Sequence, residues 1–330
     1  MHWASGVTLG KSVINLKHKL GIALGGGGAR GTIHIGVLKA LRRHRIKIDA
    51  VSGTSAGSVV AASYCCGTIR ELENFIINVT RKEIFSMLDP VFLQGVLGGK
   101  RLEEWLEKIT LGKKFEDLKI PLAINATDIR KGKQFVFRKG DIAKAIVASC
   151  SYPGIFAPVK YRGMLLADGG ILNKVPVDIL PSLGADIVIG VNVTGYEGML
   201  PASTRIINRG EFFAEKFEKI RIERENAAKI RKYYSENRIA ELRSKNKPVI
   251  NLKKKKFHER YSAVRIVADS LILNFPKRNC NYEKNSDLMI SPKFSGISSF
   301  DFLKGREAIA LGRECAEREI PVIRRMLKEF

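Results

Sequence analysis

The fold is decided by residues 20–57, which read LGIALGGGGARGTIHIGVLKALRRHRIKIDAVSGTSAG. The stretch opens with five apolar or small residues, Leu20 to Leu24, which are typical of a buried strand. Four glycines follow, and residues 29–44 then carry apolar side chains at helical spacing, namely Ile33, Val37, Leu38 and Leu41. A second strand is expected at residues 48–52, and it leads into a turn at residues 53–57. This order of strand, glycine loop, helix and strand predicts an α/β unit.

The rest of the chain continues to alternate between helix and strand signals. Further helices are expected at residues 58–66, 69–81, 102–109, 141–149 and 264–273. Further strands are expected at residues 121–127, 134–138, 159–162, 164–167, 185–193 and 288–291, with hairpins joining the first pair and the second pair. A closing helical stretch at residues 301–328 is expected to be interrupted at Pro321. The pattern predicts an α/β fold with a layered, mostly parallel sheet flanked by helices.

The composition is that of a globular protein with a large core and a strong positive charge. Hydrophobic residues make up 45% of the 330 residues, and the formal net charge is +24. Five cysteines without regular spacing argue against a disulfide framework and for a reducing compartment. Residues 1–19 lack the apolar core of a signal peptide, and the sequence has no run of 18 apolar residues. We expect a cytoplasmic protein, with any membrane contact peripheral and on the inner face.

Residues 205–260 break the alternating pattern. They contain 18 Lys and Arg against 8 Asp and Glu, with apolar residues at helical spacing. We expect a basic amphipathic insertion at residues 205–262, between a core at residues 19–204 and a C-terminal completion of that core at residues 263–330. The insertion fits contacts in a homodimer or attachment to an anionic membrane surface. Nucleic-acid binding is disfavoured because no recognised binding motif accompanies the charge.

The pentapeptide Gly53-Thr54-Ser55-Ala56-Gly57 has the form of a G-x-S-x-G nucleophile elbow. In such an elbow a serine sits on a tight turn from strand to helix, and the flanking residues are small because neighbouring backbone crowds there. An apolar strand before the motif and an apolar helix after it provide that context. The alternative is an ordinary glycine-rich turn, which the pentapeptide alone does not exclude.

The glycine-rich stretch Gly25 to Gly31 allows two interpretations. Its subset Gly26, Gly28 and Gly31 matches the G-x-G-x-x-G pattern of a dinucleotide site, but Asp49 comes before the second strand instead of ending it. An oxyanion hole fits better, because acyl transfer needs convergent backbone N–H donors and consecutive glycines permit the necessary turn.

The turn Asp168-Gly169-Gly170 follows an apolar strand at residues 164–167. Asp-Gly is by itself a common turn dipeptide, so this motif alone indicates only a turn. The aspartate leaves a buried strand at a sharp turn.

Together, the three motifs resemble those of the patatin-like phospholipase family, particularly its bacterial single-domain members. In that family G-G-G-x-[KR]-G supplies the oxyanion hole, G-x-S-x-G the nucleophile and D-G-[AG] the base. The resemblance spans roughly residues 19–200 and implies a patatin-like, FabD/lysophospholipase-like fold. It implies a Ser55–Asp168 dyad, with Gly26, Gly27 and Gly28 as the oxyanion hole. Supporting positions are Arg30, Gly31, Gly53, Gly57, Gly169 and Gly170.

The function implied is a serine acyl hydrolase that cleaves carboxylic esters of phospholipids or lysophospholipids through an acyl-enzyme on Ser55. Such a mechanism needs no metal or organic cofactor. Two other classes keep the same motifs: a membrane-associated regulator or scaffold with weak esterase activity, and a lipid acyltransferase.

Histidine is the competing base, because acyl-carrier transacylases share the elbow and use a Ser–His pair. Only His258 follows Asp168 in the sequence, and it lies in a lysine-rich run that is typical of a solvated surface. His34 lies one turn into the first helix, close to the glycine cluster, and is expected to be a packed helix residue.

Overall fold

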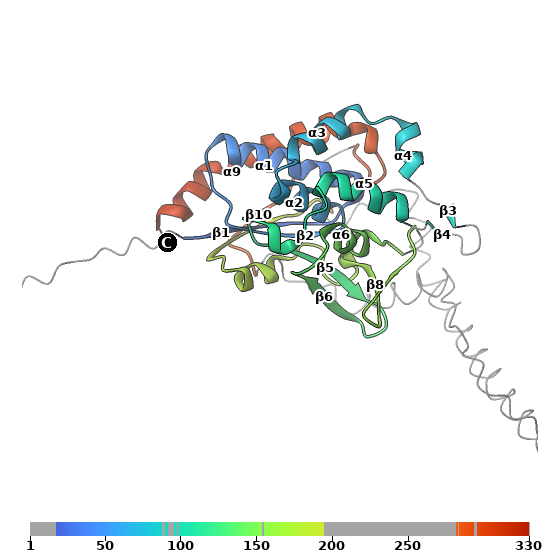
Figure 1. The fold of residues 1–330 in the computed structure, drawn as a ribbon. Coiled ribbons are helices and arrows are strands. Elements are labelled where there is room, and N and C mark those ends of the chain that lie inside the picture. Colours follow the sequence, from blue (N-terminus) through green and yellow to red (C-terminus); the bar gives the residue numbers. More distant parts are fainter. Residues whose placement is uncertain are drawn as a thin grey trace, which may run out of the picture. The chain divides into compact units, whose positions relative to one another are not determined.

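A computed structural model of the chain describes residues 18–87, 90–91, 96–97, 99–153, 155–194, 282, 284–293 and 296–329. At its centre lies an 8-stranded mixed sheet in which β10, β9, β1, β2 and β5 are parallel neighbours in that order (Figure 1). β5 pairs antiparallel with both β6 and β8, and β8 pairs antiparallel with β7. The strands are β1 Leu20–Leu24, β2 Ala50–Thr54, β5 Leu122–Asp128, β6 Lys133–Phe137, β7 Val159–Tyr161, β8 Met164–Asp168, β9 Ile187–Val191 and β10 Leu288–Ile290. The predicted α/β fold with a mostly parallel sheet is therefore confirmed.

Helices cover one face of this sheet, and α1 packs along α9 in that layer (Figure 1). In the same layer α2 lies on β2 and α6 lies on β5. The α-helices are α1 Ile33–Arg43, α2 Ala56–Cys66, α3 Ile69–Asn78, α4 Arg81–Met87, α5 Lys100–Thr110, α6 Ile142–Cys150 and α9 Gly305–Glu329. Short 3-10 helices are η1 Gly28–Thr32, η2 Phe115–Asp117, η3 Gly169–Ile171, η4 Val177–Leu183 and η6 Phe302–Lys304. A separate two-stranded sheet pairs β3 Pro90–Val91 with β4 Val96–Leu97.

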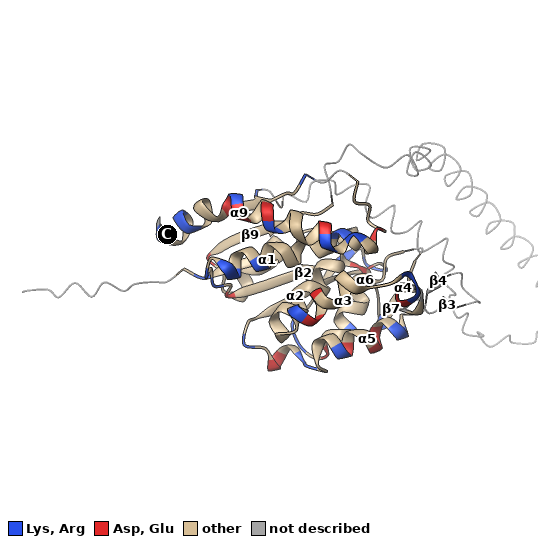
Figure 2. Cartoon of the chain, turned by 90° about the horizontal axis from the view of Figure 1, so that it is seen from above, with Lys and Arg blue, Asp and Glu red and all other residues tan. Residues whose placement is uncertain are grey.

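The first strand is buried on both faces, as its apolar sequence predicts. Ile22 and Leu24 belong to the main hydrophobic core, whereas Ala23 belongs to a smaller cluster with Val177 and Leu180 of η4. Alternate residues of a strand point to opposite faces, so the two clusters lie on opposite sides of the sheet. Lys, Arg, Asp and Glu positions are frequent on the ribbons of α5 and α9 in Figure 2, whereas β2 and β9 contain no charged residue.

Most predicted elements differ from the structure by one to a few residues at their bounds, and three of these differences are described here. The helix expected at residues 29–44 begins as the 3-10 helix η1 and becomes α-helical only at Ile33. The second strand lies at residues 50–54, two residues later than predicted. The helix expected at residues 69–81 ends at Asn78, because Thr80 and Glu83 exchange capping hydrogen bonds that start α4.

The prediction that Pro321 interrupts the last helix is wrong. α9 continues through this proline to Glu329. A proline inside a helix costs about 3 kcal/mol, because it removes a backbone hydrogen bond and its ring crowds the preceding turn. Ala316, Ile320 and Ile323 are buried on both sides of the proline, and this burial offsets the cost.

Several predictions fall on residues that the structure does not describe. They are the insertion at residues 205–262, the helix at residues 264–273 and the environment of His258. Among the helices that are described, none combines the length and the apolar character needed to cross a bilayer.

Candidate active site

Two strands of opposite direction end next to each other on the same edge of β5. β2 runs parallel to β5 and ends with Thr54 opposite Asn125, whereas β8 runs antiparallel and ends with Asp168 opposite Ala126. The other edge of β5 is occupied by β6, since Ala126 also pairs with Phe135. The two strand ends therefore face each other, and this brings Ser55 and Asp168 together although 113 positions separate them.

Ser55 lies on a sharp turn between β2 and α2, as the elbow motif predicts. Its backbone has φ 52° and ψ −128°, a conformation that L-residues seldom adopt, and it is the N-cap residue of α2. The turn is closed by Ser58, whose backbone N–H and side-chain hydroxyl both donate to the Ser55 carbonyl oxygen. A Cβ on Gly57 would lie 2.2 Å from the Leu24 carbonyl oxygen, so this position admits only glycine.

The Ser55 hydroxyl donates a hydrogen bond to Asp168, with 2.6 Å between Oγ and Oδ2. Asp168 is 3% exposed, and its other oxygen, Oδ1, accepts from the Gly170 N–H at 2.7 Å. Burial raises the pKa of Asp168 from 3.8 to about 6, because a carboxylate is poorly stabilised away from water, although both hydrogen bonds oppose the rise. The carboxylate is therefore more basic than an ordinary aspartate and is in contact with the hydroxyl proton.

The glycine loop, defined as Gly25 to Ala29, has two backbone amides without a hydrogen-bond acceptor in the described part of the chain. The N–H of Gly25 donates to Val191, that of Gly26 to Lys174 and that of Ala29 to Ser299. Within the loop, and counting acceptors among the described residues, the amides of Gly27 and Gly28 are left for a ligand. Gly28 has φ 59°, and a Cβ there would lie 2.4 Å from the Ser299 carbonyl oxygen.

The loop also lies beside the serine. A Cβ on Gly26 would be 3.2 Å from the Ser55 Cβ. Of the three predicted oxyanion glycines, Gly26 thus adjoins the serine but already uses its N–H, whereas Gly27 and Gly28 keep theirs.

The remaining predicted site residues support these three segments. Arg30 donates from Nε to the Ile297 carbonyl oxygen at 2.8 Å and from Nη1 to that of Thr194. Gly31 is buried against Ala56 at the start of α2. Gly53 lies in β2 opposite Ile124, and Gly169 begins η3 directly after Asp168.

Sequence reasoning missed a buried polar cluster beneath the dyad. Asn125 accepts a hydrogen bond from the Thr54 hydroxyl at 2.5 Å, and its amide nitrogen donates to the carbonyl oxygens of Gly169 and Asn173. One side chain therefore contacts the residue before the nucleophile and the residue after the base. The only signal in the sequence was an asparagine in the middle of an apolar strand.

Ser149 was missed as well, although it lies in a segment that resembles the family. Its hydroxyl, fully buried at the end of α6, accepts the backbone N–H of Ser55 at 2.8 Å. The Ser55 amide is thus occupied and unavailable to a substrate oxygen.

His34 is fully buried in the first turn of α1, with Nε2 2.7 Å from the Gly25 carbonyl oxygen. Burial lowers the pKa of His34 to about 4, so the ring is neutral near pH 7 and Nε2 carries the hydrogen that it donates. No hydrogen bond joins His34 to Ser55 in the described chain. His34 therefore supports the glycine loop, whereas the proton acceptor in contact with Ser55 is Asp168.

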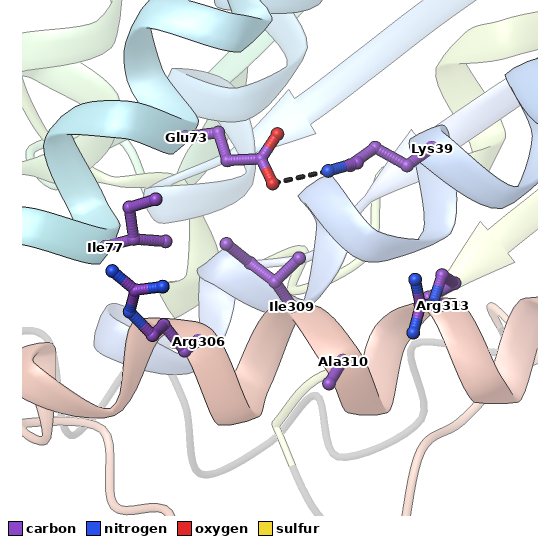
Figure 3. Close-up of a pocket in the computed structure, with 7 residues that line it drawn as sticks. All are labelled: Lys39, Glu73, Ile77, Arg306, Ile309, Ala310 and Arg313. Atoms are coloured by element: carbon purple, nitrogen blue, oxygen red, sulfur yellow. Dashed lines mark hydrogen bonds and ion pairs between the residues drawn. The ribbon is translucent and has the colours of Figure 1, made fainter.

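A cavity of about 240 Å³ between α1, α3 and α9 lies apart from this site (Figure 3). Lys39 and Glu73 form an ion pair at its wall, and Arg306 and Arg313 of α9 line it. None of the predicted site residues contributes to the lining.

Comparison with known sequences gives a family model and several relatives, each matching about half of the chain. Residues 22–181 match the family model of the patatin-like phospholipases. An uncharacterized NTE family protein of Mycobacterium tuberculosis is 37% identical over 180 residues, which are 54% of this chain and 50% of that protein. Lysophospholipase NTE1 of Scheffersomyces stipitis is 30% identical over 190 residues, 55% of this chain and 12% of that protein. The chain thus spans half the length, or less, of these curated relatives.

Among solved structures, VipD from Legionella pneumophila has a similar fold. The TM-score is 0.53 at 15% sequence identity, and the match covers 93% of this chain and 67% of VipD.

Proposed function

We propose that this protein, whose residues 22–181 match the family model of the patatin-like phospholipases, hydrolyses carboxylic esters of phospholipids or lysophospholipids through Ser55. The observation that carries the proposal is the hydrogen bond from Ser55 Oγ to the buried carboxylate of Asp168. A serine on an elbow, a basic carboxylate and two free amides are the groups that acyl transfer requires.

The reaction begins when Ser55 Oγ attacks the ester carbonyl carbon while Asp168 Oδ2 accepts the hydroxyl proton. The carbonyl oxygen becomes negatively charged and receives hydrogen bonds from the amides of Gly27 and Gly28. When the tetrahedral intermediate collapses, the bond to the leaving alcohol breaks, and that oxygen takes the proton from Asp168. Water then attacks the acyl-Ser55 ester while Asp168 accepts its proton. The bond between the acyl carbon and Ser55 Oγ breaks, Oγ takes that proton from Asp168, and the fatty acid leaves.

The family and the charge support this substrate class. One matched relative is named a lysophospholipase, and the family model is that of phospholipases. The formal net charge of +24 favours contact with an anionic lipid surface, which suits a peripheral membrane enzyme.

The test is a panel of phospholipids, lysophospholipids and a soluble short-chain ester, assayed with the full chain and with Ser55→Ala and Asp168→Asn. Both variants are expected to lose at least 99.9% of the activity, because each removes one member of a unit. Ser182→Ala, a change at an exposed serine of η4, serves as the control and is expected to keep full activity. A fluorophosphonate probe is expected to label the wild type but not Ser55→Ala.

Other outcomes would change the assignment. Rapid labelling without fatty-acid release, but with the acyl chain recovered on a second alcohol, would make the protein an acyltransferase. No labelling and no turnover would favour the regulator or scaffold. Substantial activity in either dyad variant would refute the dyad.

A further inference from the structure

Large apolar side chains are exposed at one place beside the glycine loop. Phe300, Phe302 and Leu303 are 72%, 41% and 50% exposed and lie within four consecutive residues. We call these three side chains the apolar rim. A cluster of exposed apolar side chains costs solubility, and its usual purpose is contact with a partner or a membrane.

The backbone that carries the apolar rim is attached directly to the glycine loop. The Ala29 N–H donates to the Ser299 carbonyl oxygen at 2.8 Å, and the Arg30 side chain donates to the Ile297 carbonyl oxygen. Phe300 is therefore the next residue after a contact with the loop that borders Ser55. A surface that covers the apolar rim therefore lies against the segment that is bonded to the glycine loop.

The apolar rim is also held in a defined conformation. Asp301 accepts the Ser298 N–H at 2.6 Å, and Ser298 Oγ accepts the Phe300 N–H at 3.0 Å. The Lys304 side chain closes the segment by donating to the Gly296 carbonyl oxygen at 2.6 Å. A preorganised apolar surface loses little conformational entropy when it is covered, and this favours binding.

A further exposed ring lies on the base side of the dyad. Tyr152 is 57% exposed and follows Ser151, whose carbonyl oxygen accepts the Asp168 N–H at 3.0 Å. Exposed apolar side chains therefore adjoin, in the chain, one residue that is bonded to the glycine loop and one that is bonded to Asp168. A tyrosine, with an apolar body and a polar tip, suits the boundary between lipid and water.

We propose that Phe300, Phe302 and Leu303 insert into the surface of an anionic phospholipid bilayer and place Ser55 at the level of the lipid esters. The inference rests on the proposed lipid hydrolase function. A lipid surface fits better than a protein partner, because a protein bound here would stand between Ser55 and a substrate that resides in a membrane. The formal net charge of +24 adds attraction to anionic headgroups.

The experiment compares the full chain with the double variant Phe300→Ser/Leu303→Ser. Vesicles of equal parts phosphatidylcholine and phosphatidylglycerol are sedimented to measure binding, and hydrolysis is measured on the same vesicles and on a soluble short-chain ester. We expect the double variant to bind at least tenfold more weakly and to lose vesicle hydrolysis in proportion, because two exposed apolar side chains that the bilayer would cover are replaced by polar ones. Hydrolysis of the soluble ester is expected to stay at the wild-type level.

Leu111→Ser is the matched control, since Leu111 is 61% exposed at the end of α5, away from the segment that contacts the glycine loop. It is expected to bind vesicles like the wild type. If the double variant bound vesicles as well as the wild type does, the proposal that the apolar rim inserts into the bilayer would be wrong. If the wild type failed to hydrolyse the soluble ester, the proposed hydrolase function would be wrong instead. Failure of the membrane insertion and failure of the hydrolase function are therefore distinguishable.

A second variant covers the case in which the double variant does not fold. Phe300→Trp keeps the apolar surface and adds a fluorophore whose emission, after subtraction of the wild-type spectrum, shifts to shorter wavelength when it enters lipid. A blue shift on adding the vesicles supports insertion. An unchanged spectrum with bound vesicles would show that membrane contact occurs elsewhere and would overturn the proposal.

Discussion

Ser55 Oγ and Asp168 Oδ2 lie 2.6 Å apart because β2 and β8 approach each other from opposite directions along one edge of β5. The position of the dyad is therefore a property of the sheet register and not of a flexible loop. A strand end is a rigid support, so the hydroxyl and the carboxylate are oriented before a substrate binds.

Asp168→Asn is expected to abolish hydrolysis and at the same time to stabilise the fold at neutral pH. The pKa of Asp168 in the folded protein is raised from 3.8 to about 6, so the ionised form favours the unfolded state. This penalty is absent below about pH 4, grows up to about pH 6 and is full at pH 7–8, where it amounts to roughly 3 kcal/mol at most. Urea unfolding at pH 4 and at pH 8 measures it: the variant should gain stability only at pH 8. A loss of stability at pH 8 would contradict the assigned burial cost.

The pH dependence of kcat/KM is expected to follow the ionisation of Asp168. Activity on a soluble ester should rise tenfold per pH unit below about pH 6 and level off above it, because only the carboxylate accepts the serine proton. The pKa of His34 is lowered to about 4, so His34 cannot produce this inflection. His34→Gln should therefore retain the inflection near pH 6 while lowering kcat through a looser glycine loop. An inflection that disappears in His34→Gln would restore the Ser–His alternative.

Asn125 is expected to be a positioning residue for the dyad. Its side chain contacts both Thr54 and Gly169, the neighbours of Ser55 and Asp168. Asn125→Ala should lower kcat by roughly 10- to 100-fold with little change in KM and cost about 1–3 kcal/mol of stability, since buried polar groups lose their partners. Asn125→Asp places a second carboxylate beside Asp168 and should move the inflection in kcat/KM to higher pH.

Steady-state kinetics across pH, together with urea unfolding, separate these effects. A purely structural role would lower stability in both variants without moving the inflection.

Thr54→Val removes the same hydrogen bond from the other side. The loss of kcat in the double variant Thr54→Val/Asn125→Ala should be smaller than the two single losses combined, because both changes act on one contact.

The sequence predicts the local features of this protein better than the long-range ones. The strand at residues 20–24, the elbow at Ser55 and the turn at Asp168 follow from residues close together in the chain, and the structure contains all three elements. The dyad distance was implied only by the family resemblance, because no local pattern encodes how β2 and β8 meet on β5. Asn125 could not be assigned for the same reason, since its partners are 44 to 71 positions away.

A sequence also does not show which backbone N–H groups already donate to an acceptor within the fold. Gly26, Gly27 and Gly28 look equivalent, yet the Gly26 N–H is bound to Lys174, 148 positions along the chain. Pro321 is the opposite case. The proline by itself predicts a break in the helix, but the burial of Ile320 and Ile323 keeps α9 continuous.

The last prediction concerns the contact between α1 and α9, where two helix glycines let the backbones approach closely. A Cβ on Gly36 would lie 2.0 Å from the Ile309 carbonyl oxygen, and a Cβ on Gly312 would lie 2.0 Å from that of Ile33. Within a helix, alanine is favoured over glycine by about 1 kcal/mol. Gly36→Ala and Gly312→Ala should nevertheless destabilise the fold by about 2 kcal/mol or more, since the helices must move apart.

Ala310→Gly is the reciprocal control, because Ala310 lies in α9, as Gly312 does, but is exposed. It should cost only the intrinsic preference of about 1 kcal/mol. Urea unfolding of the three variants measures the difference. If Gly36→Ala and Gly312→Ala raised stability, helix propensity would outweigh packing, and the close approach of α1 and α9 would be wrong. Since only residues 30–32 of η1 separate the glycine loop from α1, the same variants should also lower kcat. Recovery of kcat relative to the wild type on cooling would link the loss to that contact.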